Sequence, residues 1–348
     1  MNKYFTAFFL LVLSFFYIFF SNDSGGGRVF VNLLTFAGIY GLAAIGINVH
    51  FGWTGLLNFG HAAFMGIGAY TTVLLIPHSL GREGVVISTG LPLPLAIILG
   101  LIAAALLGLL LGLPTLRLRG DYLAIVTIAA AEIFRLLVRD FEDLTGGVYG
   151  IIQFSDSLQN SRPDFITRFS ENYNISSAQL WVGILTWSSI VIVLIILARL
   201  KKSPWGRALR AVREDEDAVR ALGKNAVLLK LQSFMLGAAI GGLSGIFLVF
   251  NYGTVQASTF VPVLTFYVWA ALILGGVGSL GGPALGAVMF WVIIAGTDTI
   301  SRFLFESPDG QQLAGVRFVI VGLLIMFCMI FKPSGILGDK EELLLDVK

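Results

Sequence analysis

The chain has 348 residues, of which 56% are hydrophobic and only 13% are charged. Soluble domains carry roughly 25% charged residues, so this composition excludes a soluble globular fold and indicates a polytopic membrane protein. A net charge of +2 gives no reason to expect a nucleic-acid partner, and a single cysteine excludes an intrachain disulfide and a cysteine-based structural zinc site.

Ten apolar runs approach the roughly 20 residues that a helix needs to cross a bilayer. We therefore predict an all-α fold of about ten transmembrane helices, or eight or nine if some short or glycine-interrupted runs do not cross. All of them belong to one membrane domain, residues 1–348. The runs lie near 4–20, 29–50, 55–76, 91–113, 121–138, 179–199, 230–251, 260–276, 283–300 and 314–331.

The first run, 4–20, has the alternative of being a signal peptide, because Lys3 precedes it and polar residues follow it. Its apolar core is longer than the usual length of about 7–15 residues, and no small-residue cleavage pattern follows it. A retained membrane span is therefore favoured.

Two glycine-rich segments, 52–68 and 274–286, interrupt the apolar pattern. Non-helical backbone in a membrane is tolerated where it is buried in protein or lines a wet cavity, and paired interruptions point to a transport pathway. The alternative is that the glycines only allow close helix packing, as the four-residue spacing of glycines from 237 to 245 indicates. The glycines predicted to border the pathway are Gly60, Gly276, Gly278 and Gly281.

Few polar side chains occur within the apolar runs, and these are the candidates for substrate contact. Glu132 is the most informative, since an ionisable residue inside a span is a functional candidate and needs a partner. Arg135, one helical turn on, is able to neutralise it as a purely structural ion pair, and His61 has the alternative of being a hydrogen-bonded structural residue. The candidates are Asn58, His61, Glu132, Asn251 and Tyr252.

Charged residues are concentrated in two segments. Nine of the 23 Lys and Arg lie between Arg199 and Lys230, whereas residues 139–178 carry three arginines and six acids. Because Lys and Arg favour cytoplasmic loops, we predict that 200–229 is a cytoplasmic segment and 139–178 an external loop. With ten crossings, the 115–119 turn, the tail after residue 331 and both termini are also cytoplasmic.

Residues 203–223 predict an amphipathic helix that is capped by Ser203, begins with Pro204 and closes at Gly223. Its apolar face recurs at helical spacing. That face consists of Trp205, Leu209, Val212, Val219 and Leu222.

A helix of this kind suits a groove on a soluble partner. The alternative of lying on anionic lipid is disfavoured by the acidic run 214–217, which the leaflet would repel. The residues predicted to couple the chain to a partner are Trp205, Arg210, Arg213, Glu214, Glu216, Asp217 and Gly223.

No enzyme motif fits its surroundings. Residues 276–281 read Gly-Val-Gly-Ser-Leu-Gly, but a dinucleotide site needs this pattern in a soluble βαβ unit rather than between two apolar runs. No phosphate-binding loop is present, and the three histidines lack metal-ligand spacing. We therefore expect neither an enzyme nor a metal or bound cofactor, so any ATP dependence has to come from a partner.

Five sequence blocks occur in order along the chain. They are Gly-Trp-Thr-Gly-Leu-Leu-Asn-Phe-Gly-His-Ala-Ala-Phe at 52–64, Leu-Arg-Leu-Arg-Gly-Asp-Tyr-Leu-Ala-Ile-Val-Thr at 116–127, Thr-Gly-Gly at 145–147, Ser-Pro-Trp-Gly-Arg-Ala-Leu-Arg-Ala-Val-Arg at 203–213 and Gly-Gly-Val-Gly-Ser-Leu-Gly-Gly-Pro at 275–283. Together they resemble the LivM-type permeases of ABC importers for branched-chain and other neutral amino acids. The resemblance runs from about residue 30 to Pro-Ser-Gly-Ile-Leu at 333–337.

The resemblance implies a translocation subunit in the lipid of a bacterial inner membrane. It also implies a second, LivH-like permease, two cytoplasmic ATPases that bind ATP and Mg²⁺, and an external solute-binding protein. Asp-Ala-Val at 217–219, followed by Gly223, looks like a variant of the Glu-Ala-Ala-x-x-x-Gly motif of importer permeases. A urea importer permease is an alternative. A secondary transporter driven by an ion gradient is disfavoured, because Glu132 is nearly the only carboxylate available for ion coupling.

Overall fold

The computed structural model describes residues 26–80, 86–87, 90–115, 121–173, 175–304, 310–331 and 334–338. The predicted first span, most of the 115–119 turn and most of the C-terminal tail lie outside these residues. The elements, in chain order, are α2 (Gly26–Thr54), α3 (His61–Leu74), β1 (His78–Leu80), β2 (Val86–Ile87), α4 (Leu93–Thr115), α5 (Asp121–Asp140), α6 (Glu142–Thr145), β3 (Ile151–Ile152), α7 (Asp156–Gln159), α8 (Asp164–Asn172), α9 (Ser177–Lys202), α10 (Pro204–Glu214), α11 (Glu216–Ala221), α12 (Ala226–Tyr252), the 3₁₀ helix η1 (Ala257–Phe260), α13 (Pro262–Gly275), α14 (Gly282–Leu304) and α15 (Gly310–Phe331).

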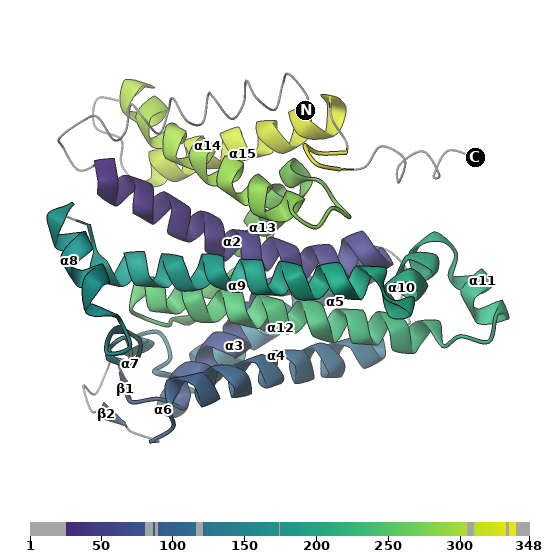
Figure 1. Ribbon diagram of the computed structural model, residues 1–348, viewed down its shortest axis with the longest axis horizontal. Coiled ribbons are helices and arrows are strands. Elements are labelled where there is room, and N and C mark those ends of the chain that lie inside the picture. The colour runs from purple at the N-terminus through teal and green to yellow at the C-terminus, as the bar shows by residue number, and fades with distance from the viewer. Residues whose placement is uncertain are drawn as a thin grey trace.

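Within the described residues, four helices are long and apolar enough to cross a membrane, namely α2, α4, α9 and α12. Most of α2 and α12 is buried, whereas most of α4 and α9 faces outward, so the first pair forms the centre of the bundle. In Figure 1, α13, α14 and α15 lie on one side of α2, and α9, α12 and α4 lie on the other. The predicted span at 121–138 corresponds to α5, which is not one of the four and carries five charged residues.

Glycines set the distance between the central helices. α12 packs against α2, α3 and α4. A Cβ atom on Gly237 would collide with the His50 ring and the Gly46 carbonyl, and one on Gly245 would collide with the backbone of Met65. The close packing that the four-residue glycine spacing predicts is therefore present between α12 and both α2 and α3.

The first glycine-rich segment folds back into the bundle. α2 ends at Thr54, yet a Cβ on Gly46, two turns earlier, would touch the ring of His61, the first residue of α3. α3 has 14 residues, or about 21 Å, which is short of the roughly 30 Å hydrocarbon core. Residues 55–60 thus form a non-helical connection from which α3 packs back against α2.

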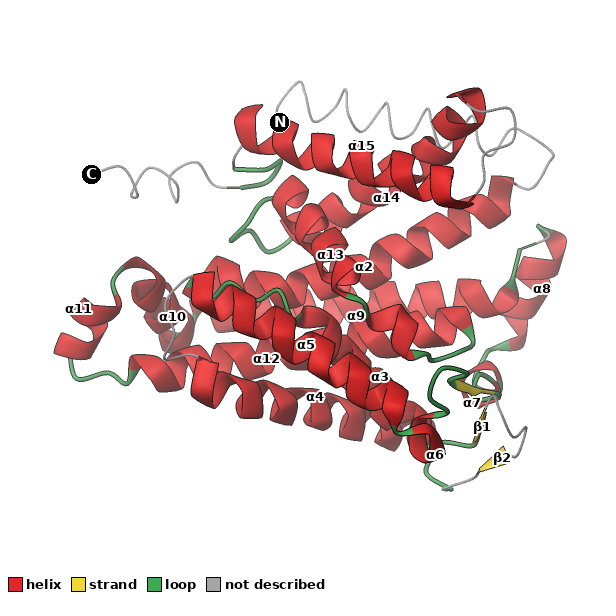
Figure 2. Ribbon diagram, turned by 180° about the vertical axis from the view of Figure 1, so that it is seen from behind, coloured by secondary structure: helices red, strands yellow, loops and turns green. Residues whose placement is uncertain are grey.

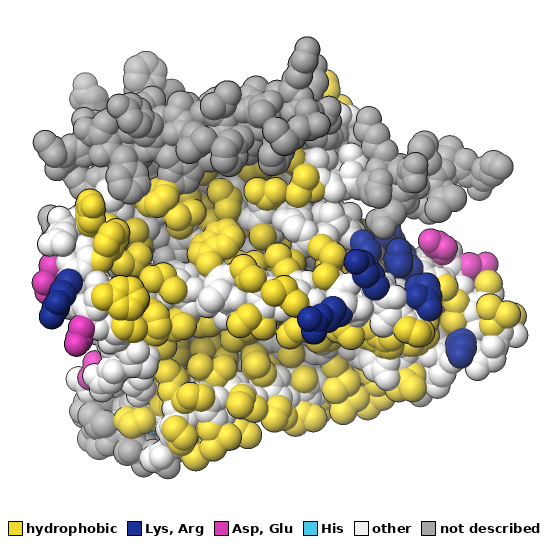
Figure 3. Space-filling view, viewed as in Figure 1, with side chains coloured by type: hydrophobic (Ala, Val, Ile, Leu, Met, Phe, Trp, Pro, Cys, Tyr) yellow, Lys and Arg dark blue, Asp and Glu magenta, His cyan; other side chains and the backbone are white. Residues whose placement is uncertain are grey.

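The bundle has two distinct ends. α10 and α11 project from one end, whereas α6, α7, α8 and the strands gather at the other (Figures 1 and 2). β1 pairs antiparallel with β2 and β3, and Ile151 of β3 bridges to Val255. These short strands are not predicted by the sequence pattern. Figure 3 shows a broad apolar surface between the two charged ends, as a bilayer-embedded protein requires.

Replacing Gly237 with valine should destabilise the bundle, because the new side chain has to displace the His50 ring or separate α12 from α2. Overpacking of this kind costs about 1–3 kcal/mol. The measurement is the apparent Tm of the detergent-solubilised protein. Gly296→Ala is the matched control, since a Cβ there meets open space among the described residues. An unchanged Tm for Gly237→Val would contradict the packing.

Candidate functional site

The coupling segment, defined as residues 200–229, contains two helices instead of the single helix predicted for 203–223. Ser203 caps α10 as predicted, its Oγ accepting the Gly206 N–H at 3.3 Å. Asp215 then adopts an extended backbone and accepts the Ala218 N–H at 2.9 Å, which starts α11. The one-helix prediction is wrong here because an aspartate that caps the next turn competes with helix continuation. Gly223 closes α11 with a positive φ of 74°, as predicted.

The break changes which side chains the segment buries. Leu209 and Val212 of α10 are buried, and Val219 of α11 packs with Val212 and Ala226 in a small apolar cluster. Leu222, predicted to share this face, is 80% exposed. The segment therefore exposes an apolar side chain just after α11.

The residues predicted to couple the chain to a partner separate into an inward and an outward group. Trp205, on the inward side, donates from Nε1 to Gln232 at 2.8 Å and packs edge-on against Trp53. Arg210 donates to the Lys201 carbonyl at 3.4 Å. The outward group is exposed and consists of Glu214, Asp217 and Gly223.

Glu216 fastens α11 to α12. Its carboxylate accepts hydrogen bonds from Lys230 of α12 and, at 2.6 Å, from Arg220 of α11. Partial burial alone would raise the pKa of Glu216, but the hydrogen bonds and positive charges of Lys230 and Arg220 lower this pKa below its ordinary value. The carboxylate is therefore ionised and paired at neutral pH.

Arg213 connects the coupling segment to the first helix break. Its Nη1 donates to the Gly52 carbonyl in the last turn of α2 at 2.7 Å. Two neighbouring carbonyls of that turn are satisfied locally, by the N–H groups of Gly55 and Leu56. A cation at a helix C-terminus both satisfies a free carbonyl and complements the helix dipole.

The second break, 276–281, is held against the same end of α2. Asn48 accepts the Gly278 N–H and donates to the Ser279 carbonyl, both at 2.8 Å. Lys201 of the coupling segment donates to the Gly278 carbonyl at 2.9 Å. The coupling segment is therefore hydrogen-bonded to the second break and to the last turn of α2, which leads into the first break.

Three of the four glycines predicted to border the pathway are required by the local backbone or by close packing, and the fourth is not. Gly276 and Gly278 have φ values of 110° and 80°, which glycine adopts without strain. A Cβ on Gly60 would collide with the Thr127 carbonyl, whereas Gly281 faces open space in the described structure. None of the four lines the pocket described below.

Asn58 closes the first break as a buried structural residue. It donates to His50 Nδ1 at 3.1 Å and accepts the Gly60 N–H at 2.8 Å. His50 Nε2 lies 2.9 Å from the Phe234 carbonyl, so this nitrogen carries the proton and Nδ1 accepts from Asn58. His61 is fully buried, and neither ring nitrogen has a hydrogen-bond partner among the described residues, which differs from the hydrogen-bonded role considered from sequence.

The two remaining substrate-contact predictions are the partly exposed Glu132 and Asn251. Glu132 accepts a hydrogen bond from Arg135 Nε at 2.9 Å, so the ion pair considered from sequence is present. The Asn251 Oδ1 atom is buried without a partner in the part of the chain that the structure describes. Neither residue lines the pocket.

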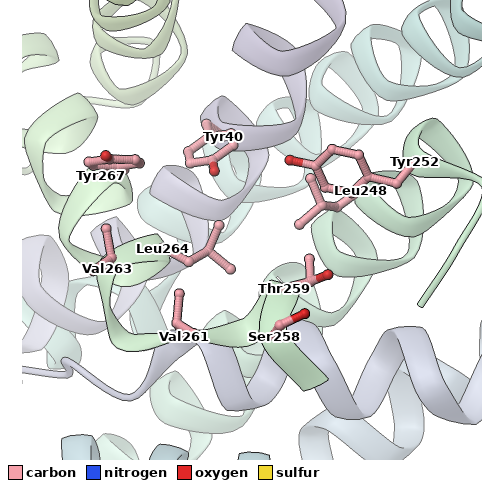
Figure 4. A pocket seen from close by; sticks show the side chains of 9 residues that line it. All are labelled: Tyr40, Leu248, Tyr252, Ser258, Thr259, Val261, Val263, Leu264 and Tyr267. Carbon is pink, nitrogen blue, oxygen red and sulfur yellow. The ribbon is translucent and has the colours of Figure 1, made fainter. Parts of the chain in front are cut away.

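A cavity of about 210 Å³ lies between α2, α12, η1 and α13. Tyr252 is the one substrate-contact prediction that lines it. The other lining residues are not predicted from the sequence, because uncharged side chains from separate helices give no local signal. The lining consists of Tyr40, Leu248, Tyr252, Ser258, Thr259, Val261, Val263, Leu264 and Tyr267 (Figure 4).

Comparison with known proteins shows the family to which the chain belongs. Residues 29–330 match the family model described as branched-chain amino acid transport system / permease component. The chain is 35% identical to the branched-chain amino acid permease LivM of Salmonella typhimurium, covering 88% of this chain and 69% of the relative. It is 28% identical to a probable LivM of Methanocaldococcus jannaschii, covering 88% and 93%.

The chain is also 26% identical to the permease LivH of Escherichia coli, covering 89% of this chain and 94% of the relative. No solved structure gives a significant match. The family resemblance inferred from the five sequence blocks is confirmed by these matches. The chain belongs to the family of branched-chain amino acid transport permease components.

Proposed function

We propose that this chain is the translocation subunit of an ATP-driven importer of branched-chain amino acids in the cytoplasmic membrane. The family match over residues 29–330 carries the proposal. Relatives that align over most of this chain are named as permease proteins of high-affinity branched-chain amino acid transport systems. The apolar bundle with two charged ends supports a membrane location.

The orientation follows from charge. The coupling segment is rich in Lys and Arg, whereas residues 139–178 at the opposite end carry more acids than bases. We place the coupling segment in the cytoplasm and residues 139–178 outside. Ten crossings in one membrane domain then leave both termini in the cytoplasm.

The exposed tip of the coupling segment is the docking surface for soluble ATPase subunits. It offers carboxylates at Glu214 and Asp217 beside the apolar side chain of Leu222, which is 80% exposed. An apolar anchor inside a polar rim is typical of a protein interface. The complete importer contains a second, LivH-like permease, two ATPases that bind ATP and Mg²⁺, and an external solute-binding protein. This chain transports and does not hydrolyse ATP.

The contacts inside the coupling segment offer a route for the ATPase motion. Arg213 holds the Gly52 carbonyl, and Lys201 holds the Gly278 carbonyl. Displacing the segment therefore displaces both helix breaks together, while Glu216 keeps α11 attached to α12. Two arrangements of these breaks, favoured by different nucleotide states of the ATPases, give alternating access.

The function is tested by purifying the tagged chain from its own membranes and identifying the copurifying proteins by mass spectrometry. We expect a second permease and two ATPases at near-stoichiometric amounts. The purified complex, reconstituted with its binding protein, should then take up labelled leucine but not urea when ATP is supplied. Recovery of the chain alone, with uptake driven by an ion gradient, would overturn the proposal.

The docking surface is tested with Leu222→Asp, which places a charge on the exposed apolar anchor. ATPase association, measured by pull-down from detergent, should weaken at least about tenfold, as expected for one interface anchor. Phe165→Asp is the matched control, because Phe165 is also apolar and 69% exposed but lies on α8 at the opposite end. Equal ATPase recovery from both variants would argue against this surface.

Arg213→Ala tests the link to the first break. Leaving the Gly52 carbonyl without its donor costs about 1–3 kcal/mol. We expect the ATPases to remain bound and to hydrolyse ATP while leucine uptake falls about tenfold. The control is Arg207→Ala on the same helix, since Arg207 donates to the Lys202 carbonyl and not to a break. A parallel loss of hydrolysis and uptake would point to misassembly instead of uncoupling.

A further inference from the structure

The pocket between α2 and α13 has a lining of mixed character without charge. Five of its residues carry hydroxyl groups, and the other four are aliphatic. Such a lining suits a small ligand that has a polar part and an aliphatic part but no net charge. A cationic ligand would find no carboxylate among these lining residues.

Tyr40 is the most unusual residue of the lining. It is only 5% exposed, and its hydroxyl points into the cavity, as does that of Tyr252 across from it (Figure 4). No hydrogen bond of the Tyr40 hydroxyl is found in the described part of the chain. The Tyr40 side chain is buried but its hydroxyl faces the cavity, so a ligand or a water molecule there has to provide its hydrogen bond.

Two helix ends meet at the same pocket. α13 begins there, with Val261, Val263 and Leu264 in the lining and no side-chain cap on its first turn. Pro262 has no N–H and the Leu264 N–H bonds the Val261 carbonyl, so the Val263 N–H is the donor of this turn that can meet a ligand. α12 ends there, at Tyr252. The start of a helix attracts a carboxylate through its free N–H groups, and the end of a helix attracts a cation. The pocket thus lies between a positive and a negative helix end, which complements a zwitterion.

We propose that this pocket holds the amino acid in transit, with its carboxylate at the first turn of α13, its ammonium group near Tyr40, Tyr252 and the end of α12, and its alkyl side chain against Leu248 and Leu264. The inference rests on the proposed function and adds the site of substrate contact. The exposed rim residues Tyr252 and Ser258 leave one side open for entry and exit. With no charged side chain to hold it, the substrate binds weakly, which favours onward transfer.

The test uses the complete importer in proteoliposomes, with Tyr40→Phe removing only the hydroxyl. Leucine uptake should fall about three- to tenfold, the effect of losing one hydrogen bond. ATP hydrolysis stimulated by the binding protein should stay unchanged. Tyr70→Phe is the matched control, because the Tyr70 hydroxyl is also buried without a partner but lies outside the pocket. It should transport as the unaltered complex does.

A second variant, Val263→Trp, reduces the volume of the pocket, and a substrate with a longer side chain needs more of that volume. Uptake of leucine should fall more than uptake of alanine, so the alanine-to-leucine ratio should rise.

A labelling measurement avoids any dependence on transport. With the single cysteine replaced in Cys328→Ser, a thiol reagent should modify Thr259→Cys, and millimolar leucine should slow this reaction more than the same concentration of urea or lysine.

The outcomes separate the two proposals. If the unaltered complex shows no ATP-dependent leucine uptake, the proposed function fails. If it transports leucine but Tyr40→Phe matches Tyr70→Phe, the Val263→Trp ratio is unchanged and leucine gives no protection at Thr259→Cys, only the pocket assignment is overturned. If a transport variant fails to assemble, the labelling of Thr259→Cys tests the site by itself. Protection by leucine supports the assignment, and no protection overturns it.

Discussion

The polar backbone groups at the two helix breaks have to be hydrogen-bonded inside an otherwise apolar bundle, since hydrocarbon provides no partners. Three long polar side chains meet this demand. Asn48 binds the adjacent residues Gly278 and Ser279 in the second break, Arg213 binds the last turn of α2, and Lys201 binds Gly278. Two of the three come from the coupling segment, so the groups that stabilise the breaks also tie them to the cytoplasmic end.

The central helix α2 joins the two candidate sites. α9, α10, α12, α13 and α14 all pack against it, and most of it is buried. Tyr40 in the pocket and Gly52 at the Arg213 contact lie on this one helix, twelve residues or about 18 Å apart. A tilt of α2 imposed at Gly52 would therefore reach the pocket through the helix itself.

The sequence predicts the features that depend on local pattern. Apolar length predicts the long helices, glycine spacing predicts the approach of α12 to α2, and Ser203 with Pro204 predicts the start of α10. The break at Asp215 is not predicted because the helical periodicity of the apolar residues continues across it. Aspartate is nevertheless a common N-cap residue, and Asp215 caps the first turn of α11. The pocket is missed for a different reason, since its lining comes from α2, α12, η1 and α13 and is assembled only by their packing.

The length of α9 has a consequence for the height of the coupling segment. Its 26 residues extend about 39 Å, roughly 9 Å more than the hydrocarbon core, and its last turns carry Arg199, Lys201 and Lys202. Lys201 bonds the Gly278 carbonyl, whereas the exposed Arg199 and Lys202 are positioned to reach lipid headgroups. The close corner at Gly206 then leaves α10 little freedom to shift along the membrane normal. The position of the bilayer surface therefore sets how far α11 extends toward the cytoplasm. A change in bilayer thickness would change the geometry of the coupling segment.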